Sequence, residues 1–192
     1  MPGWQKFYEA NQDQNFELVT VAEDVQGAEK ALPWLKKAHA RYVTLIDREN
    51  QLGSRFQVNY VPLTILYDET GRVVRGPQHF NGSSSKSYEE LSNWLRNGQS
   101  ALTQKGLSKP EKAMGFESPE AELRFQLAAL LIQQGNKPLA LRQLKSALQK
   151  SPNNFIILKQ IWAIENPERF YSSKVDFKWQ REQLKQMTEK PE

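Results

Sequence analysis

The N-terminal half of the chain alternates between short apolar runs and amphipathic segments. Apolar runs rich in β-branched residues at 16–21, 42–46 and 61–67 predict strands, because polar residues bound each run. Between the first two runs, apolar positions at helical spacing predict a helix over residues 28–39. A strand, helix and strand of this length form a parallel crossover unit. Residues 49–56 predict a further short helix after the second strand.

A hairpin and a closing helix complete this pattern. Gly71 lies in a short connection between the third strand and an apolar run at 72–75, which is typical of a β-hairpin. The segment 88–96 carries its large apolar residues on one helical stripe, with Ser87 as the expected N-cap and Gly98 as the expected stop. The pattern therefore predicts an α/β fold, with a mixed sheet flanked by helices.

The C-terminal half has a purely helical pattern. Residues 99–118 lack periodicity and predict a linker. Residues 121–154 place small, apolar and proline residues at the offsets of a tetratricopeptide unit, although any amphipathic helical hairpin can meet that pattern by chance. A second unit begins at Phe155 but is interrupted by Pro167. Isolated repeats bury little surface, so we expect these helices to pack on one another and on the first region.

The composition narrows the chemistry of the chain itself. It contains no cysteine, which excludes disulfides and thiolate metal sites within these residues and leaves the compartment open. His39 and His79 are too far apart in sequence, and too isolated from carboxylates, to predict a zinc site or a catalytic triad. We therefore predict no metal and no cofactor. No apolar run has the length of a membrane span or the form of a secretory signal.

The positive charge lies mostly in the C-terminal half. The net charge is +4, and the lysines and arginines after residue 104 are spread along the predicted helices among acidic residues. A nucleic-acid interface would gather such charges into a dense patch with aromatic residues between them. The pattern instead predicts a solvated helical face, so we expect no nucleic-acid partner.

Residues 4–98 resemble the TlpA/ResA-like branch of the thioredoxin superfamily. The residues that carry the resemblance are Trp4-Gln-Lys-Phe-Tyr-Glu9, the run from Phe16 to Asp24, Leu45-Ile-Asp47, Leu52-Gly53, Phe56 with Val58, Val61-Pro62, Thr64-Ile-Leu-Tyr-Asp68 and Gly71. The resemblance implies that Pro62 is a cis-proline and that Val61 and Pro62 bind an extended substrate segment. It also makes Glu23 and Asp24 candidates for acids near a redox turn, while a polar strand end is the ordinary interpretation of such acids.

The chain departs from that family at one decisive place. Members of the family have a strand and a Trp-Cys-x-x-Cys turn directly before the first helix, whereas here no strand precedes the helix predicted over residues 1–11. The resemblance places the missing strand at the centre of the sheet, which would leave open edges. Our hypothesis is an amino-terminally shortened form in which Met1 is an internal methionine, for example after an in-frame UGA that encodes selenocysteine.

Two functions follow from these observations. The first is membership of the thioredoxin-like thiol–disulfide oxidoreductases, with no catalytic residue in this chain and with a protein thiol, a protein disulfide or a small oxidant as substrate of the complete form. The second is a non-catalytic interaction module that binds a protein partner through the C-terminal helices and their aromatic residues. The predicted organisation is an incomplete thioredoxin-like domain at 1–98, a linker at 99–118 and a tetratricopeptide-like region at 119–192.

Overall fold

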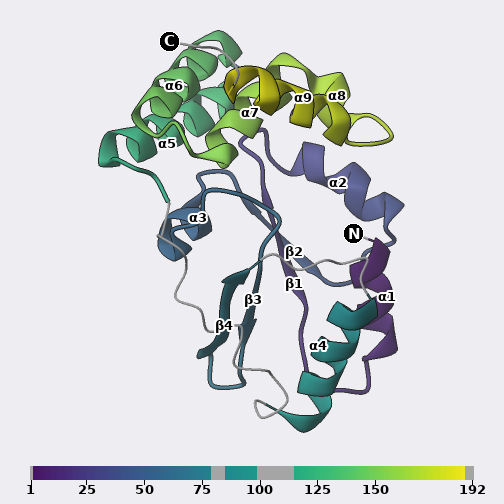
Figure 1. The fold of residues 1–192 in the computed structure, drawn as a ribbon. Coiled ribbons are helices and arrows are strands. Elements are labelled where there is room, and N and C mark those ends of the chain that lie inside the picture. Colours follow the sequence, from purple (N-terminus) through teal and green to yellow (C-terminus); the bar gives the residue numbers. More distant parts are fainter. Residues whose placement is uncertain (1, 79–84, 99–114, 189–192) are drawn as a thin grey trace.

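The chain has a mixed α/β fold in the computed structural model, which describes residues 2–78, 85–98 and 115–188 (Figure 1). The α/β region consists of α1 (Pro2–Ala10), β1 (Val19–Glu23), α2 (Ala28–Lys37), β2 (Val43–Asp47), α3 (Gln51–Phe56), β3 (Thr64–Tyr67), β4 (Val73–Gln78) and α4 (Ser85–Asn97). The helical region consists of α5 (Pro119–Gln133), α6 (Lys137–Lys150), α7 (Phe155–Glu165), α8 (Pro167–Tyr171) and α9 (Phe177–Thr188). His79 and most of the predicted linker lie outside the described residues.

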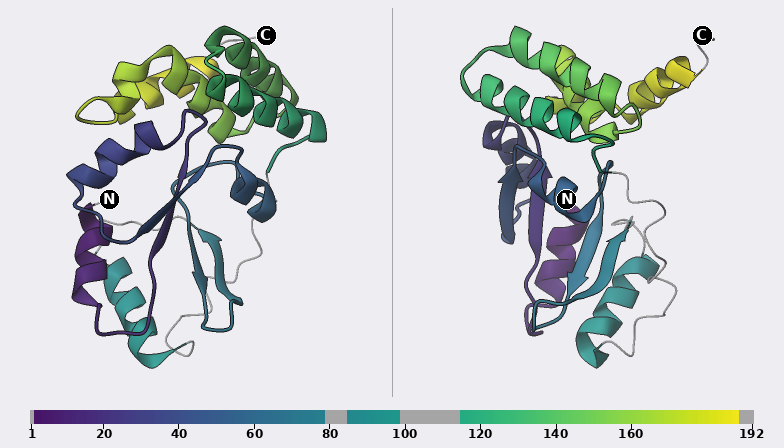
Figure 2. Two further views of the ribbon diagram at one scale, coloured as in Figure 1. Left: turned by 180° about the vertical axis from the view of Figure 1, so that it is seen from behind. Right: turned by 90° about the vertical axis from the view of Figure 1, so that its left-hand side faces the viewer.

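The strands form two separate two-stranded sheets. β1 and β2 are parallel, as the crossover pattern predicted, and their register pairs Val19 with Val43 and Glu23 with Asp47. β3 and β4 are antiparallel and are joined by a turn in which Gly71 has a φ of 80°, a left-handed conformation that favours glycine. Figure 2 shows the two sheets side by side with β1 and β3 as the neighbouring strands, yet within the described residues no backbone ladder joins them.

Several boundaries differ from the prediction by one or more residues, and three of them have an evident reason. β1 begins at Val19 rather than Phe16, because the Phe16 ring packs against the Phe7 and Tyr8 rings of α1, with centroids 5.9 and 5.8 Å apart. β3 begins at Thr64, because the residues before it form a loop against α7. Ser87 is not the N-cap of α4, since that helix already starts at Ser85 and Ser87 lies inside its first turn.

A small apolar cluster holds α1 and α4 against β3. Its buried members are Phe7, Leu66 and Leu91, and the Phe7 ring stacks on Tyr88 with a centroid distance of 5.5 Å. Nearby, the buried guanidinium of Arg75 pairs with a Glu90 oxygen of α4 at 2.6 Å. α1 therefore contacts the hairpin through Leu66 and the approach to β1 through Phe16.

A larger core lies within the helical region. Alanines at the helix contacts are fully buried, as the small-residue pattern predicted, and they surround Phe125 and Leu144. Val25, which follows β1 in the α/β region, is also fully buried in this cluster. The helical region and the end of β1 therefore share one core.

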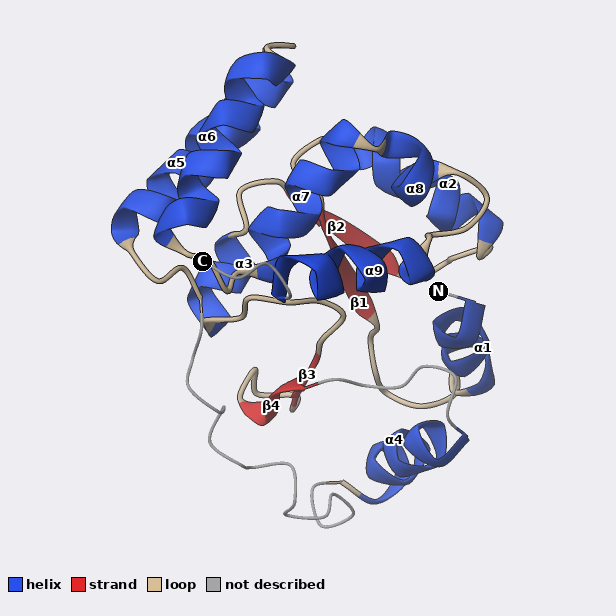
Figure 3. Ribbon diagram, turned by 45° about the horizontal axis from the view of Figure 1, so that its top comes forward, coloured by secondary structure: helices blue, strands red, loops and turns tan. Residues whose placement is uncertain are grey.

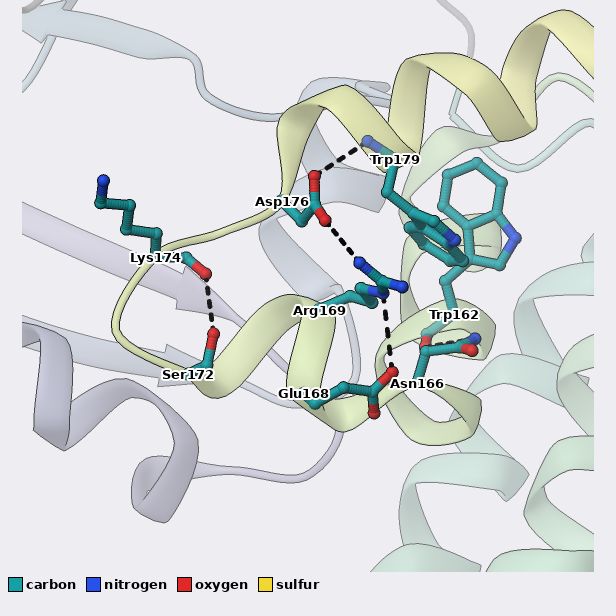
Figure 4. Close-up of polar contacts among 8 residues, drawn as sticks. All are labelled: Trp162, Asn166, Glu168, Arg169, Ser172, Lys174, Asp176 and Trp179. Atoms are coloured by element: carbon teal, nitrogen blue, oxygen red, sulfur yellow. Dashed lines mark hydrogen bonds and ion pairs between the residues drawn. The ribbon is translucent and has the colours of Figure 1, made fainter.

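The last two helices pack on α7 through aromatic rings. The Trp162 and Trp179 rings meet edge to face with centroids 5.5 Å apart, and Arg169 lies over Trp179 at 5.9 Å (Figure 4). Arg169 also donates to Asp176 at 2.8 Å, and an Asp176 oxygen accepts from the backbone N–H of Trp179 at 2.9 Å. Trp162 is thus core, while Phe177 on the far side of α9 is exposed.

Some apolar side chains remain on the surface. Val19, Val43 and Leu45 share one face of the β1–β2 sheet and are 47, 48 and 52% exposed. On α5, Leu123, Leu127 and Leu130 form an exposed stripe. Among the helices that the structure describes, none combines the length and the apolar character needed to cross a bilayer.

Replacing Asn154 by alanine should destabilise the chain by about 1–2 kcal/mol. The buried Asn154 carboxamide oxygen accepts from the N–H groups of Ile156 and Ile157 at 3.0 and 3.1 Å, so it caps α7. Asn136→Ala is the matched control, because the exposed Asn136 accepts only from Leu139 at 3.2 Å and its loss should cost less. Urea unfolding measures both changes, and equal losses would contradict the buried cap.

Candidate functional site

Two carboxyl groups meet at the carboxyl ends of β1 and β2. Glu23 and Asp47 are paired in the strand register, and their side chains share a hydrogen bond. Burial, followed by the nearby Asp47 charge, raises the pKa of Glu23 to about 8. Asp47 has a second role, because its oxygens accept from the N–H groups of Gln51 and Leu52 at 2.9 and 2.7 Å at the start of α3. Glu23 therefore keeps its proton to a higher pH than an ordinary glutamate does.

Asp24 connects the same end of β1 to the helical region. The Tyr171 hydroxyl donates to Asp24 Oδ2 at 2.7 Å and accepts from the Gln26 amide at 2.9 Å. The Lys30 ammonium lies 4.9 Å from the centre of the Tyr171 ring. Burial raises the pKa of Asp24 against the lowering effect of the Tyr171 hydrogen bond. These contacts give Asp24 a structural role between β1 and α8.

The Val61–Pro62 loop lies against the start of α7. The Val61–Pro62 peptide bond is cis, as the resemblance implied, and the Pro62 ring is exposed. The Asn59 carbonyl accepts from the Ile156 N–H at 3.1 Å, and the Asn59 amide donates to the Asn153 carbonyl at 3.1 Å. The Val61 carbonyl accepts from Lys159 Nζ at 3.3 Å. This carbonyl is therefore already hydrogen-bonded within the chain.

Two consecutive residues of α7, Lys159 and Gln160, bind the ends of both two-stranded sheets. The Gln160 side chain accepts from the Val25 N–H at 3.2 Å and donates to the Glu23 carbonyl at 2.9 Å, whereas Lys159 bonds to Val61. The carboxyl end of β1 and the amino end of β3 thus lie at the same end of the molecule, beneath α7 (Figure 3). β1 and β3 therefore run in opposite directions, and in the part of the chain that the structure describes no strand pairs with their facing edges.

The structure brings some predicted residues together and adds others. Glu23 and Val61 both contact α7, but among the described residues no hydrogen bond or ion pair joins Glu23 to Val61 or Pro62. Sequence reasoning missed Lys159 and Gln160, because ordinary polar residues within an apolar helix carry no signal of what they face. It could have found the Glu23–Asp47 pair, since adjacent parallel strands that both end in an acid place those acids together.

Metal binding has no support in the part of the chain that the structure covers. Within it, no group of three or more His, Asp or Glu side chains could hold an ion. His39 is exposed and directly follows the C-cap of α2, with a φ of 50°. No protein-family model, curated protein or solved structure matches the chain, so no relative assigns a role to Val61, Pro62 or the acidic residues.

Proposed function

We propose that this chain is a thioredoxin-like thiol–disulfide oxidoreductase family member, inactive as these 192 residues alone, that provides the substrate-docking part of the site. The redox strand and turn would come from a segment that residues 1–192 do not contain. The observation that carries the proposal is that β1 and β3 run in opposite directions and that no strand among residues 2–78, 85–98 and 115–188 pairs with their facing edges. A strand placed between those edges would complete a five-stranded sheet.

The position of the unpaired edges supports this proposal. The resemblance places the family's redox strand between the equivalents of β1 and β3, which are the strands whose edges are open here. The residues of β1 are exposed or half-buried, so its open edge is accessible to a further strand. The half-exposed Val19, Val43 and Leu45 add an apolar face that further chain would cover.

The chemistry would take place beside the Val61–Pro62 loop. A thiolate or selenolate at the carboxyl end of the inserted strand attacks one sulfur of a substrate disulfide, forms a mixed disulfide and releases the other sulfur as a thiolate. A second thiol in the turn then displaces the first substrate sulfur, so the substrate leaves as a dithiol and the turn becomes a disulfide. Pro62 would shape the groove that holds the substrate segment, and Val61 would present its backbone N–H.

Insulin reduction in the presence of dithiothreitol tests the proposal. We expect the 192-residue chain to show only the background rate, because it contains no cysteine. A form extended by the residues encoded directly upstream should accelerate the reaction, and replacing its redox cysteine or selenocysteine by serine should abolish the gain. Upstream codons with no such residue, or an extended form without activity, would refute the proposal.

An interaction module is the second candidate, and the exposed leucine stripe of α5 favours it. Leu123, Leu127 and Leu130 lie on one face of a helix whose opposite face is already buried in the helical core. In this alternative the α/β region is a scaffold without redox chemistry, and the helices bind a protein. Background insulin reduction by both the 192-residue chain and the extended form would favour this candidate.

A further inference from the structure

A half-buried lysine, Lys159, lies beside the Val61–Pro62 loop without a carboxylate partner among the described residues. Lys159 Nζ donates to the Val61 carbonyl at 3.3 Å, and none of the ion pairs found among the described residues involves Lys159. An ammonium group has three N–H donors, so this bond leaves donors to spare. Desolvation alone lowers the pKa of Lys159, with no nearby charge contributing. Partial burial takes water away from the ammonium group and no carboxylate replaces that water, so an anion bound at this position would be favoured.

The surface around this lysine is apolar and drawn from both regions of the chain. Tyr60 is 43% exposed, Phe155 is 38% exposed, and the Pro62 ring is also exposed. The Asn59 carbonyl accepts from the Ile156 N–H, so Tyr60, which follows Asn59, and Phe155, which precedes Ile156, lie near each other. Phe155 and Lys159 are four residues apart, so they lie on the same side of α7. We call Tyr60, Pro62, Phe155 and Lys159 the Pro62 patch.

We propose that the Pro62 patch binds an extended polypeptide segment that carries an acidic side chain, with Lys159 as the residue that pairs with the acid. The exposed rings and Pro62 supply apolar contact for a segment in extended conformation. The acid would compensate the ammonium charge that the chain itself leaves unpaired. This assigns a substrate class to the docking part of the proposed oxidoreductase, and it needs no thiol chemistry to be tested.

The first experiment uses an array of random 15-residue peptides probed with the labelled 192-residue chain. Bound peptides should be enriched in aspartate and glutamate relative to the array. Lys159→Glu should remove or reverse that enrichment, whereas Lys159→Arg should keep it. Lys178→Gln is the matched control, because the Lys178 side chain is 83% exposed on α9 and already lies near the carboxylate of Glu182. Absence of acidic enrichment with the native chain would overturn the proposal.

A double-mutant cycle then separates recognition from folding. The tightest peptide and its Glu→Gln or Asp→Asn analogue are titrated against the native chain and against Lys159→Gln. We expect the native chain to prefer the acidic peptide about tenfold, which corresponds to about 1.4 kcal/mol, and Lys159→Gln to bind both peptides alike. If Lys159→Gln weakens both peptides equally, Lys159 only supports the loop and the proposal fails.

Three further outcomes have defined meanings. Displacement of the peptide by oligothymidylate at comparable affinity would assign the patch to nucleic acid and overturn the proposal. Peptide binding with acidic preference, together with no insulin reduction by the extended form, would leave this inference standing while the proposed oxidoreductase function fails. Insulin reduction by the extended form without a preference for acidic peptides would leave the oxidoreductase function standing while this inference fails.

Discussion

Val25→Asp is expected to destabilise the whole chain by at least about 3 kcal/mol. Val25 follows β1 but is fully buried in the core of the helical region, next to residues of α5, α6 and α7. An aspartate there would bury a carboxylate among apolar side chains, and no basic side chain belongs to that cluster. Urea unfolding followed by tryptophan fluorescence and by far-UV circular dichroism measures the loss.

The matched control is Val19→Asp. Val19 lies on β1 a few residues away and is about half exposed, so a charge there should cost less than about 1 kcal/mol. We also expect one cooperative transition by both probes, because the two regions share a core through Val25. Two separate transitions, with Val25→Asp shifting only one of them, would contradict a shared core.

The succession of elements was accessible from the sequence. Alternation of apolar runs with helical stripes predicted every strand and helix of the α/β region in the correct order, since local hydrophobic periodicity sets both. Gly71 indicated the hairpin, because the turn requires a left-handed conformation that glycine adopts without strain. The start of β1 was misplaced because the aromatic contacts of Phe16 with α1, which are tertiary, compete with strand pairing.

The site was only partly accessible, since its parts come together from distant positions. Val61 and Pro62 were found through the resemblance, and the acids Glu23 and Asp24 through their place after a strand. Their partners Lys159, Gln160 and Tyr171 are about a hundred residues or more away in sequence, and no local pattern specifies such contacts. The apolar residues of α7 predicted a helix that packs against other elements. They did not predict which of its polar residues faces the Val61–Pro62 loop.

α7 is the element that relates the two regions to each other. In its first turn a backbone N–H donates to the Asn59 carbonyl. In its next turn Lys159 donates to the Val61 carbonyl and Gln160 donates to the Glu23 carbonyl. Because these bonds fix the amino end of β3 relative to the carboxyl end of β1, the helical region sets the geometry of the Val61–Pro62 loop. A helical extension that only recruited a partner would not need to touch both strands.

Glu23→Gln should remove a pH-dependent loss of stability. In the folded chain the pKa of Glu23 is about 8, whereas an unfolded chain has the ordinary value of 4.5. The folded state therefore keeps a proton that the unfolded state has already released, so the free energy of unfolding falls as pH rises from about 4.5 to about 8 and then levels off. The difference between a pKa of 4.5 and one of about 8 would correspond to about 5 kcal/mol, and because the Glu23 side chain is only partly buried we expect a loss of about 3 kcal/mol.

A glutamine at position 23 stays neutral and can still donate to Asp47, so the variant should be about 2–3 kcal/mol more stable than the native chain at pH 9 and close to it at pH 5. Glu17→Gln is the control, because the exposed Glu17 lies on the approach to the same strand and its replacement should leave the slope unchanged. Urea unfolding at a series of pH values measures the difference between the curves. Parallel curves for the native chain and Glu23→Gln would show that Glu23 ionises freely in the fold. A difference confined to pH values above 5, and absent from Glu17→Gln, would assign the pH dependence to Glu23.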